Sequence, residues 1–163
     1  MGTIVVGIDG SPGSDAALRW AMDEARLRGS KLRVVNAYDL PQVLISEGGV
    51  GAAGIAVPAA MTQDDAERLR SSAEEQARGV VESAVQRVGG AVADRPEIES
   101  AVVPGPATQA LIAAGESAEL LVLGSRGRGG FLGLLLGSVS HQIAHHPPCP
   151  VVILPLPGEK EPS

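Results

Sequence analysis

Apolar positions in this chain follow two patterns that alternate along the sequence. Short runs rich in Val, Ile and Leu are typical of strands buried on both faces of a parallel sheet. They predict five strands, at residues 3–8, 31–37, 98–103, 120–123 and 151–154. Between these runs, apolar residues recur at helical spacing, which predicts helices between residues 14 and 29 and over 62–88, 108–114 and 138–144.

Serine and glycine mark several helix ends. Ser14 is the predicted N-cap of the first helix and Gly29 its C-terminal stop. Ser138 could likewise cap the last helix. The apolar stripe predicted for the long second helix consists of Leu69, Ala73, Val80, Ala84 and Val88.

Strands that alternate with helices predict an α/β fold, with a parallel sheet and helices on both faces. In such sheets, ligands bind beyond the carboxyl ends of the strands, where the strand order reverses. Asp9, Val103 and the segment that begins at Gly124 each follow a predicted strand. We therefore expect these three regions to meet at one edge of the sheet.

Two stretches lack a clear pattern. Residues 41–61 hold four glycines and two prolines without a helical or strand period, which predicts a long loop. A loop of this length is usually functional or disordered, and we favour disorder. Residues 157–163 are polar and predict a frayed tail, so the expected organisation is one domain over residues 1–156.

Composition narrows the class of ligand. The chain has 163 residues and only three aromatic side chains, Trp20, Tyr38 and Phe131. This scarcity argues against the aromatic stacking platforms that bind single-stranded nucleic acid. The net charge of -6 also disfavours a nucleic-acid binder, whose surface is basic. The positive charge of Arg126 and Arg128 is therefore local, and it suits a small anion better than a polymer.

The compartment is predicted to be the reducing cytoplasm. Cys149 is the only cysteine, and between two prolines we interpret it as a buried structural thiol. No secretory signal is evident, and no apolar run approaches the ~20 residues of a membrane helix. We therefore expect no membrane partner.

A glycine-rich segment follows the run at 120–123 and leads into the last helix, with Gly124, Gly127 and Gly137 as its spaced glycines. Glycine allows a ligand to approach the backbone closely, and a helix N-terminus offers free N–H groups and partial positive charge. Arg126 and Arg128 add positive charge nearby. Spacing alone leaves phosphate binding and plain loop glycines equally open.

Other motifs are less informative. The glycine segment lacks the Gly-Lys-Ser/Thr of a Walker loop, and residues 7–12 do not fit the dinucleotide fingerprint. His141 and His145 share one face of a helix, beside His146, but no further ligand type is spaced nearby. We interpret them as surface histidines at a helix end, with no protein metal site.

The spacing Gly124-x2-Gly127-x9-Gly137-Ser138 resembles the nucleotide-binding signature of the universal stress protein family. Residues 5–11, 102–106 and 145–153 resemble that family's first strand, fourth-strand exit and closing strand. The resemblance implies the strand order 3-2-1-4-5 and bound ATP, with Mg²⁺ held through the phosphates alone.

The resemblance also implies roles for particular residues. Asp9 would face the adenine and ribose, Gly7 and Ala37 would adjoin the base, and Val103 and Pro104 would form the opposite wall. The full set of nucleotide-binding residues that we expect is Gly7, Ile8, Asp9, Ala37, Val103, Pro104, Gly124, Ser125, Arg126, Gly127, Arg128, Gly129, Gly130, Gly137, Ser138, Val139 and Ser140.

The function we predict is that of an ATP-binding sensor or regulator in the stress response, with at most slow hydrolysis. No nucleophile paired with a base stands out, and no catalytic residue is assigned. One alternative is a dimeric interaction protein of the same fold that binds no nucleotide. The other is an enzyme that cleaves ATP between the α and β phosphates. Such enzymes usually carry Ser-Gly-Gly-x-Asp-Ser after the first strand, or a His-x-x-His-type motif, and residues 8–11 have neither.

The last strand predicts a homodimer. Val151, Val152, Ile153 and Leu154 form a short apolar edge, and unpaired backbone groups at an edge invite a second strand. Family members often dimerise in this way. Two identical edges that meet about a two-fold axis form a closed contact. We expect proline at Val152 to remove an edge donor.

Overall fold

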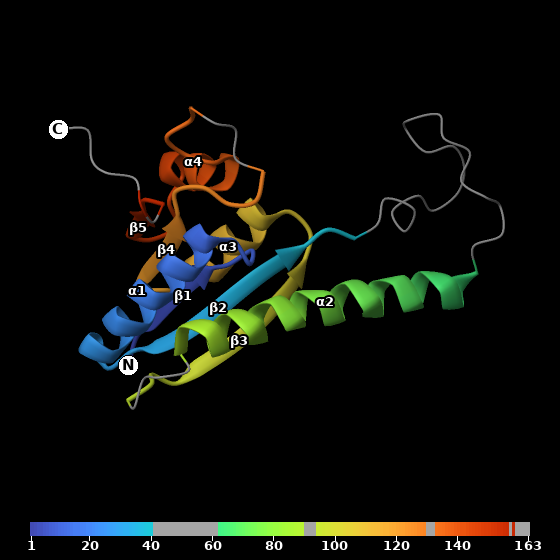
Figure 1. Ribbon diagram of the computed structural model, residues 1–163, viewed down its shortest axis with the longest axis horizontal. Coiled ribbons are helices and arrows are strands. Elements are labelled where there is room, and N and C mark those ends of the chain that lie inside the picture. Colours follow the sequence, from blue (N-terminus) through green and yellow to red (C-terminus); the bar gives the residue numbers. More distant parts are fainter. Residues whose placement is uncertain (41–61, 90–93, 130–132, 157, 159–163) are drawn as a thin grey trace.

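The computed structural model describes residues 1–40, 62–89, 94–129, 133–156 and 158. The predicted loop at 41–61 and most of the tail at 157–163 lie outside the described residues. Figure 1 shows the elements in chain order: β1 (Thr3–Gly7), α1 (Pro12–Arg28), β2 (Lys31–Tyr38), α2 (Gln63–Gly89), β3 (Ile98–Pro104), α3 (Ala107–Gly115), β4 (Leu120–Gly124), α4 (Ser138–His145) and β5 (Val151–Leu154).

The strands form one parallel sheet in the order β3-β2-β1-β4-β5. This confirms the predicted fold class and strand order. At the centre, Val6 of β1 pairs with Val34 of β2 on one side and with Val122 of β4 on the other. The chain runs outward from β1 in one direction and returns to build the other half, so the strand order reverses between β1 and β4.

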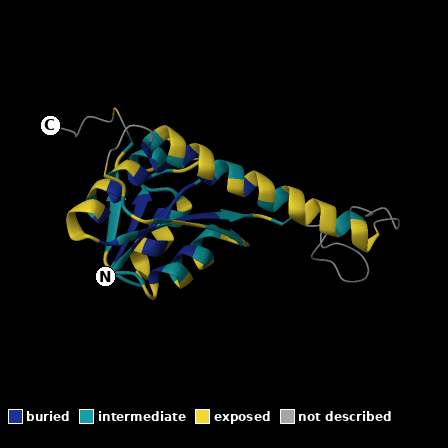
Figure 2. Cartoon of the chain, turned by 90° about the horizontal axis from the view of Figure 1, so that it is seen from below, coloured by how far each residue is buried: buried dark blue, intermediate teal, exposed yellow. Residues whose placement is uncertain are grey.

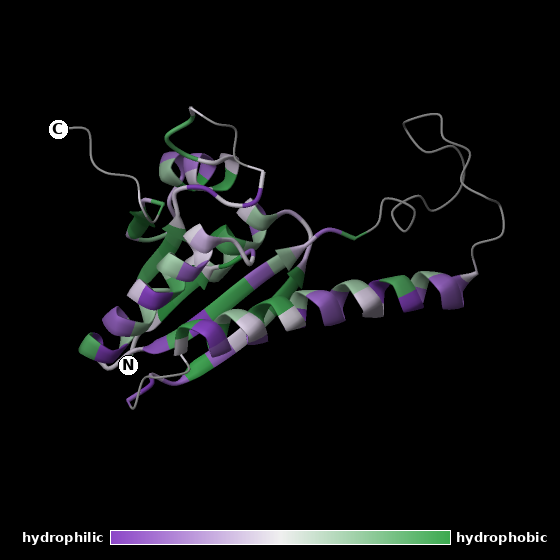
Figure 3. Ribbon diagram, in the orientation of Figure 1, coloured by the Kyte–Doolittle hydropathy of each residue, from purple (hydrophilic) through white to green (hydrophobic). Residues whose placement is uncertain are grey.

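Two apolar cores lie on opposite faces of the sheet. One contains Leu18 from α1 and Val81 from α2, packed against strand residues such as Val6. The other contains Leu111 from α3 and Ile143 from α4. The helices therefore cover both faces, as predicted. Figure 3 shows that the central strands are mainly hydrophobic, whereas α1 and α2 carry many hydrophilic residues.

The predicted stripe of the long helix α2 is confirmed only in its C-terminal part. Its buried side chains are those of Ala77, Val81 and Ala84, whereas Leu69 is 38% exposed. Only the C-terminal half of α2 packs on the sheet, and its N-terminal half extends beyond it (Figure 2). Apolar periodicity indicates a helix face, but not how far along the helix that face is covered.

The cap of α1 also differs from the prediction. Ser11 is the N-cap, and its Oγ accepts a hydrogen bond from Ser14 N at 3.2 Å. Ser14 lies one turn inside, where its Oγ donates to Ser11 O at 2.9 Å. Pro12 stands at the start of the helix, where its missing N–H costs nothing. At the other end, Gly29 closes the helix with φ 66°, as predicted.

Candidate functional site

A cavity of about 190 Å³ opens at the carboxyl ends of β1 and β4, where the strand order reverses. This is the location that parallel α/β folds use for ligands. The predicted residues that line it are Gly7, Ile8, Asp9, Ala37, Gly124, Arg126, Gly127, Arg128, Gly129, Gly137, Ser138, Val139 and Ser140.

The remaining predicted residues are placed elsewhere. Ser125 is buried and is not among the lining residues, although its backbone anchors the loop. Val103 packs into the core beside Ala37 on β2, and the exposed Pro104 does not line the cavity either. Gly130 lies outside the described residues.

The structure adds lining residues that sequence reasoning missed, namely Ser14, Val35, Ala107, Leu111 and Leu123. They come from four different elements, and all of them except Ser14 form part of an apolar wall. Leu111 and Ala107 belong to α3, whose place over the cavity depends on the path of the sheet. Leu111 lies within the helix predicted over 108–114, but no local signal in the sequence shows that it faces a ligand site.

The start of α4 is held firmly beside the cavity. Ser125 O accepts from Gly137 N at 2.6 Å and from the Ser140 hydroxyl at 2.8 Å. The first intrahelical bond is His141 N to Gly137 O, at 2.9 Å, so Gly137 and not Ser138 occupies the N-cap position.

The amides of Ser138, Val139 and Ser140 precede that first bond. They therefore have no acceptor four residues back in the helix. All three residues line the cavity. A helix start of this kind suits an anion, because free amides and the helix dipole act at the same point.

One motif glycine, Gly124, is required by packing inside the protein against a glycine of α1, Gly13. A Cβ atom on Gly124 would lie 2.9 Å from the backbone C and O of Gly13, closer than real Cβ contacts allow. A Cβ atom on Gly13 would lie 2.7 Å from Arg126 O. The start of α1 thus rests on the exit from β4. Gly124, which also lines the cavity, therefore has a packing role besides the expected close approach of a ligand.

Gly137 is different. A Cβ atom there would meet its nearest neighbours, Arg126 Cα and Ser125 O, at 3.5 Å, which is an ordinary contact. Its φ of -73° is accessible to any residue. The protein's own packing therefore does not require glycine at this position, which lines the cavity.

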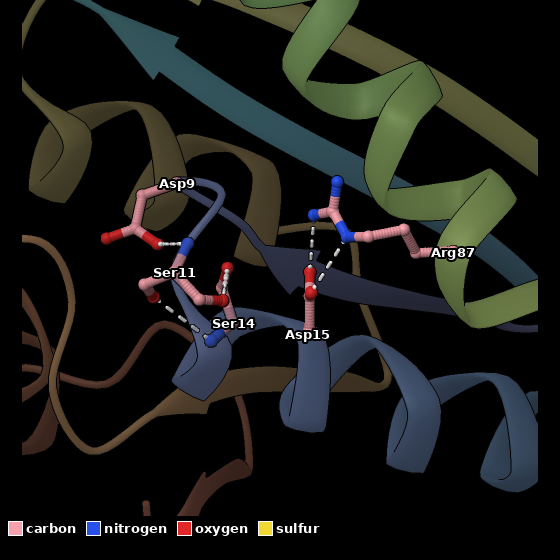
Figure 4. Close-up of polar contacts among 5 residues, drawn as sticks. All are labelled: Asp9, Ser11, Ser14, Asp15 and Arg87. Atoms are coloured by element: carbon pink, nitrogen blue, oxygen red, sulfur yellow. Dashed lines mark hydrogen bonds and ion pairs between the residues drawn. The ribbon is translucent and has the colours of Figure 1, made fainter.

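Asp9 supplies a negative charge at the same edge. Its Oδ1 accepts from Ser11 N at 2.9 Å (Figure 4), and its Oδ2 accepts from Arg128 N at 2.7 Å. Partial burial raises the pKa of the Asp9 carboxyl, but hydrogen bonds from Ser11, Arg128 N and Ser14 outweigh it. The resulting pKa lies below the ordinary value of 3.8.

The lowered pKa of Asp9 determines the pH range in which its ionised carboxylate stabilises the fold. A folded-state pKa below the unfolded value means that ionised Asp9 stabilises the fold at pH values above about 3.8. That contribution is lost as the pH falls through the lower folded-state value. At neutral pH the carboxylate is ionised and accepts both backbone bonds.

The histidines and the cysteine remain outside the site. Among the described residues, no group of three or more potential metal ligands is found. His141 and His145 are exposed, with ring centroids 4.5 Å apart. Cys149 is half-buried, not buried as predicted, because it stands at the entry to the edge strand β5. Burial raises the pKa of its thiol.

The fold and the site together define a parallel α/β protein with a ligand cavity at the point of strand reversal and an anion-suited helix start on its wall. Residues 1–155 match the model of the "Universal stress protein family". The chain belongs to this family.

Proteins with a similar sequence belong to the same family. The chain is 36% identical over 156 residues to "Universal stress protein Rv2623" of Mycobacterium tuberculosis, a match that covers 93% of this chain and 46% of the relative. It is 36% identical over 150 residues to "Universal stress protein Rv2005c" of the same organism, which covers 92% of this chain and 44% of the relative. The chain thus spans about half the length of these curated relatives.

Solved structures show the same fold. A universal stress protein UspA from Lactobacillus plantarum superposes with a TM-score of 0.71 at 18% identity, covering 94% of this chain and 97% of its own. A universal stress protein solved in complex with cAMP is 28% identical, with a TM-score of 0.54 and coverage of 94% and 96%. Among the described residues, no helix is long and apolar enough to cross a membrane.

Proposed function

We propose that this protein binds ATP in the cavity at the carboxyl ends of β1 and β4 and acts as a nucleotide-occupied sensor or regulator in the stress response. The observation that carries the proposal is the start of α4. Its first three amides, at Ser138, Val139 and Ser140, lie on the cavity wall without intrahelical partners. This arrangement suits phosphate.

The cavity has a second, apolar part that suits the base. Val35, Ala37, Leu111 and Leu123 line it with aliphatic side chains. A ligand with a flat apolar ring at one end and phosphates at the other matches both parts. Gly7 stands between Leu111 and Leu123, since a Cβ atom there would lie 2.9 Å from each of these side chains.

We expect Mg²⁺ to be held through the phosphates of ATP, because the described residues supply no cluster of protein ligands. We also expect slow turnover at most. The loop has no Walker lysine, and we assign no catalytic base on the cavity wall. The reducing cytoplasm remains our expected location.

A cyclic nucleotide is the second candidate. The relative that is 28% identical was solved with cAMP. Cyclic AMP shares the adenine end with ATP but carries a single phosphate. The start of α4 offers several amides in a row, which favours the more highly charged ligand.

We expect purified protein to bind Mg-ATP, and protein purified without added nucleotide to release ATP after heat denaturation. Mass spectrometry of the released nucleotide identifies it, and titration calorimetry on nucleotide-free protein compares ATP, ADP, AMP and cyclic AMP. Tighter binding of cyclic AMP would replace ATP by the second candidate. Absence of binding by all four nucleotides, in protein shown to be folded, would favour the interaction protein that binds no nucleotide.

We further propose a homodimer through β5, which is an edge strand of the sheet. Leu121 N donates to Pro150 O and Ser125 N donates to Leu154 O. Backbone groups along a strand alternate in direction, so Val152 also turns its N–H toward β4. The N–H groups of Val151 and Ile153 point to the open edge.

This register corrects the choice of variant. Proline at Val152 would remove a bond inside the sheet, whereas Ile153→Pro removes an outward donor. We expect the wild type to be dimeric at tens of micromolar, Ile153→Pro to be a folded monomer, and Val152→Pro to lose stability. Light scattering after size-exclusion chromatography measures the mass, and circular dichroism checks the fold. A monomeric wild type would refute the dimer, and a dimeric Ile153→Pro would place the interface elsewhere.

A further inference from the structure

The Asp9 carboxylate joins two segments that are far apart in the sequence. Its Oδ1 accepts from Ser11 N, in the turn that leads into α1. Its Oδ2 accepts from Arg128 N, 119 residues away in the glycine loop, which we define as residues 124–129. Both oxygens are thus engaged by the protein's own backbone.

The position of the Asp9 carboxylate leaves no room for a side chain at Gly127. A Cβ atom on Gly127 would overlap Asp9 Oδ2, and no other atom lies as near. Gly127 has no positive φ, so its backbone does not itself demand glycine. The side chain is excluded because the carboxylate occupies its place.

The position of the loop also bears on the start of α4. A Cβ atom on Gly137, the N-cap of α4, would have Arg126 Cα at 3.5 Å and Gly127 N at 3.7 Å among its nearest neighbours. A shift of the loop backbone therefore changes the wall beside the amides of Ser138 and Val139. Asp9 is connected to the phosphate end of the cavity through this wall.

We propose that Asp9 is a positioning residue. The hydrogen bond that Asp9 Oδ2 accepts from Arg128 N–H, which we call the pin, holds the glycine loop in place and so shapes the phosphate end of the site. This inference rests on the proposed function for its ligand, but the contacts of Asp9 with Ser11 N and Arg128 N are made within the protein alone. It differs from the role that family resemblance implies for Asp9, which is a direct contact with the adenine and ribose. The two roles make opposite predictions about which part of the nucleotide senses a change at Asp9.

The pin is tested first without any nucleotide. Hydrogen exchange of the Arg128 amide, followed by NMR, should be slow in the wild type. It should be at least about tenfold faster in Asp9→Ala, since a bond to a charged acceptor is lost. Asp9→Asn should lie between them, because the carboxamide keeps one acceptor oxygen for two donors. Asp15→Asn is the control: Asp15 pairs with Arg87 (Figure 4), and its replacement should leave the exchange of the Arg128 amide unchanged.

Gly127→Ala tests the same contact from the other side. Its methyl group should displace the carboxylate and expose the Arg128 amide even though Asp9 is intact. Combined with Asp9→Ala, it should add little, because both changes break one interaction. Additive effects on exchange, or an Arg128 amide that exchanges equally fast in the wild type and Asp9→Ala, would overturn the pin.

The ligand arm separates positioning from direct contact. Asp9→Asn should weaken ATP binding by about tenfold and adenosine binding far less, although it removes a negative charge near the phosphates. Equal losses for ATP and adenosine would assign Asp9 to the nucleoside and overturn its role in shaping the phosphate end. The wild type could bind neither ATP nor adenosine while the Arg128 amide still exchanges faster in Asp9→Ala. That result would support the positioning role of Asp9 and refute the proposed function.

Discussion

Gly124→Val should lower the melting temperature by roughly 5–10 °C. The β-carbon alone would lie 2.9 Å from the backbone C and O of Gly13, and backbone atoms cannot rotate away as a flexible side chain would. Either the start of α1 or the exit from β4 must move. Overpacking of this kind costs about 1–3 kcal/mol, and the branched Val side chain belongs at the upper end of that range.

The control for this variant is Gly79→Ala in α2. A Cβ atom at Gly79 has nothing within 4 Å, so alanine should raise stability by up to about 1 kcal/mol through helix propensity. Thermal unfolding followed by circular dichroism measures both variants. A Gly124→Val protein that melts with the wild type would show that the contact with Gly13 relaxes at no cost, and would restore a role for Gly124 confined to the ligand.

Gly137→Ala should weaken ATP binding by at least about tenfold while the protein stays folded. Its β-carbon finds ordinary contacts at 3.5 Å within the protein, so the fold tolerates it. The added methyl group stands at the N-cap, in the cavity wall, next to the free amides of Ser138 and Val139. A phosphate that accepts bonds from those amides must approach within about 3 Å, and a methyl group beside them obstructs it.

Titration calorimetry at matched protein concentration measures this loss, and the melting temperature of the same sample should stay within about 2 °C of the wild type. Ser138→Ala is the companion variant: it removes a hydroxyl but leaves the amides in place, so its effect on affinity should be smaller. Unchanged ATP affinity in Gly137→Ala would remove the phosphates from the start of α4.

These variants separate the three signature glycines by what each one faces inside the protein. Gly124 is required by packing against Gly13, Gly127 by the approach of Asp9, and Gly137 by neither. Sequence spacing treats them alike, because it records where glycines stand and not what each one faces. Only Gly137 remains free, as far as the protein's own packing is concerned, to serve a ligand.

The architecture follows from local patterns in the sequence. The alternation of apolar runs with helical periods predicted five parallel strands with helices on both faces, and Gly29 marked the end of α1. Because the side chains that specify these elements are neighbours in sequence, their spacing carries the information. The reversal of strand order then brought Asp9 and the glycine loop to one edge.

Features that depend on contacts between distant segments are visible only in the tertiary structure. It shows that only part of α2 is covered, and that Asp9 contacts Arg128 across 119 residues. It also places the backbone N–H of Ile153, and not that of Val152, on the open edge of the sheet. Each of these depends on how separate elements lie against one another. A local pattern does not encode that arrangement, since the free energy of such contacts arises only after the chain has folded.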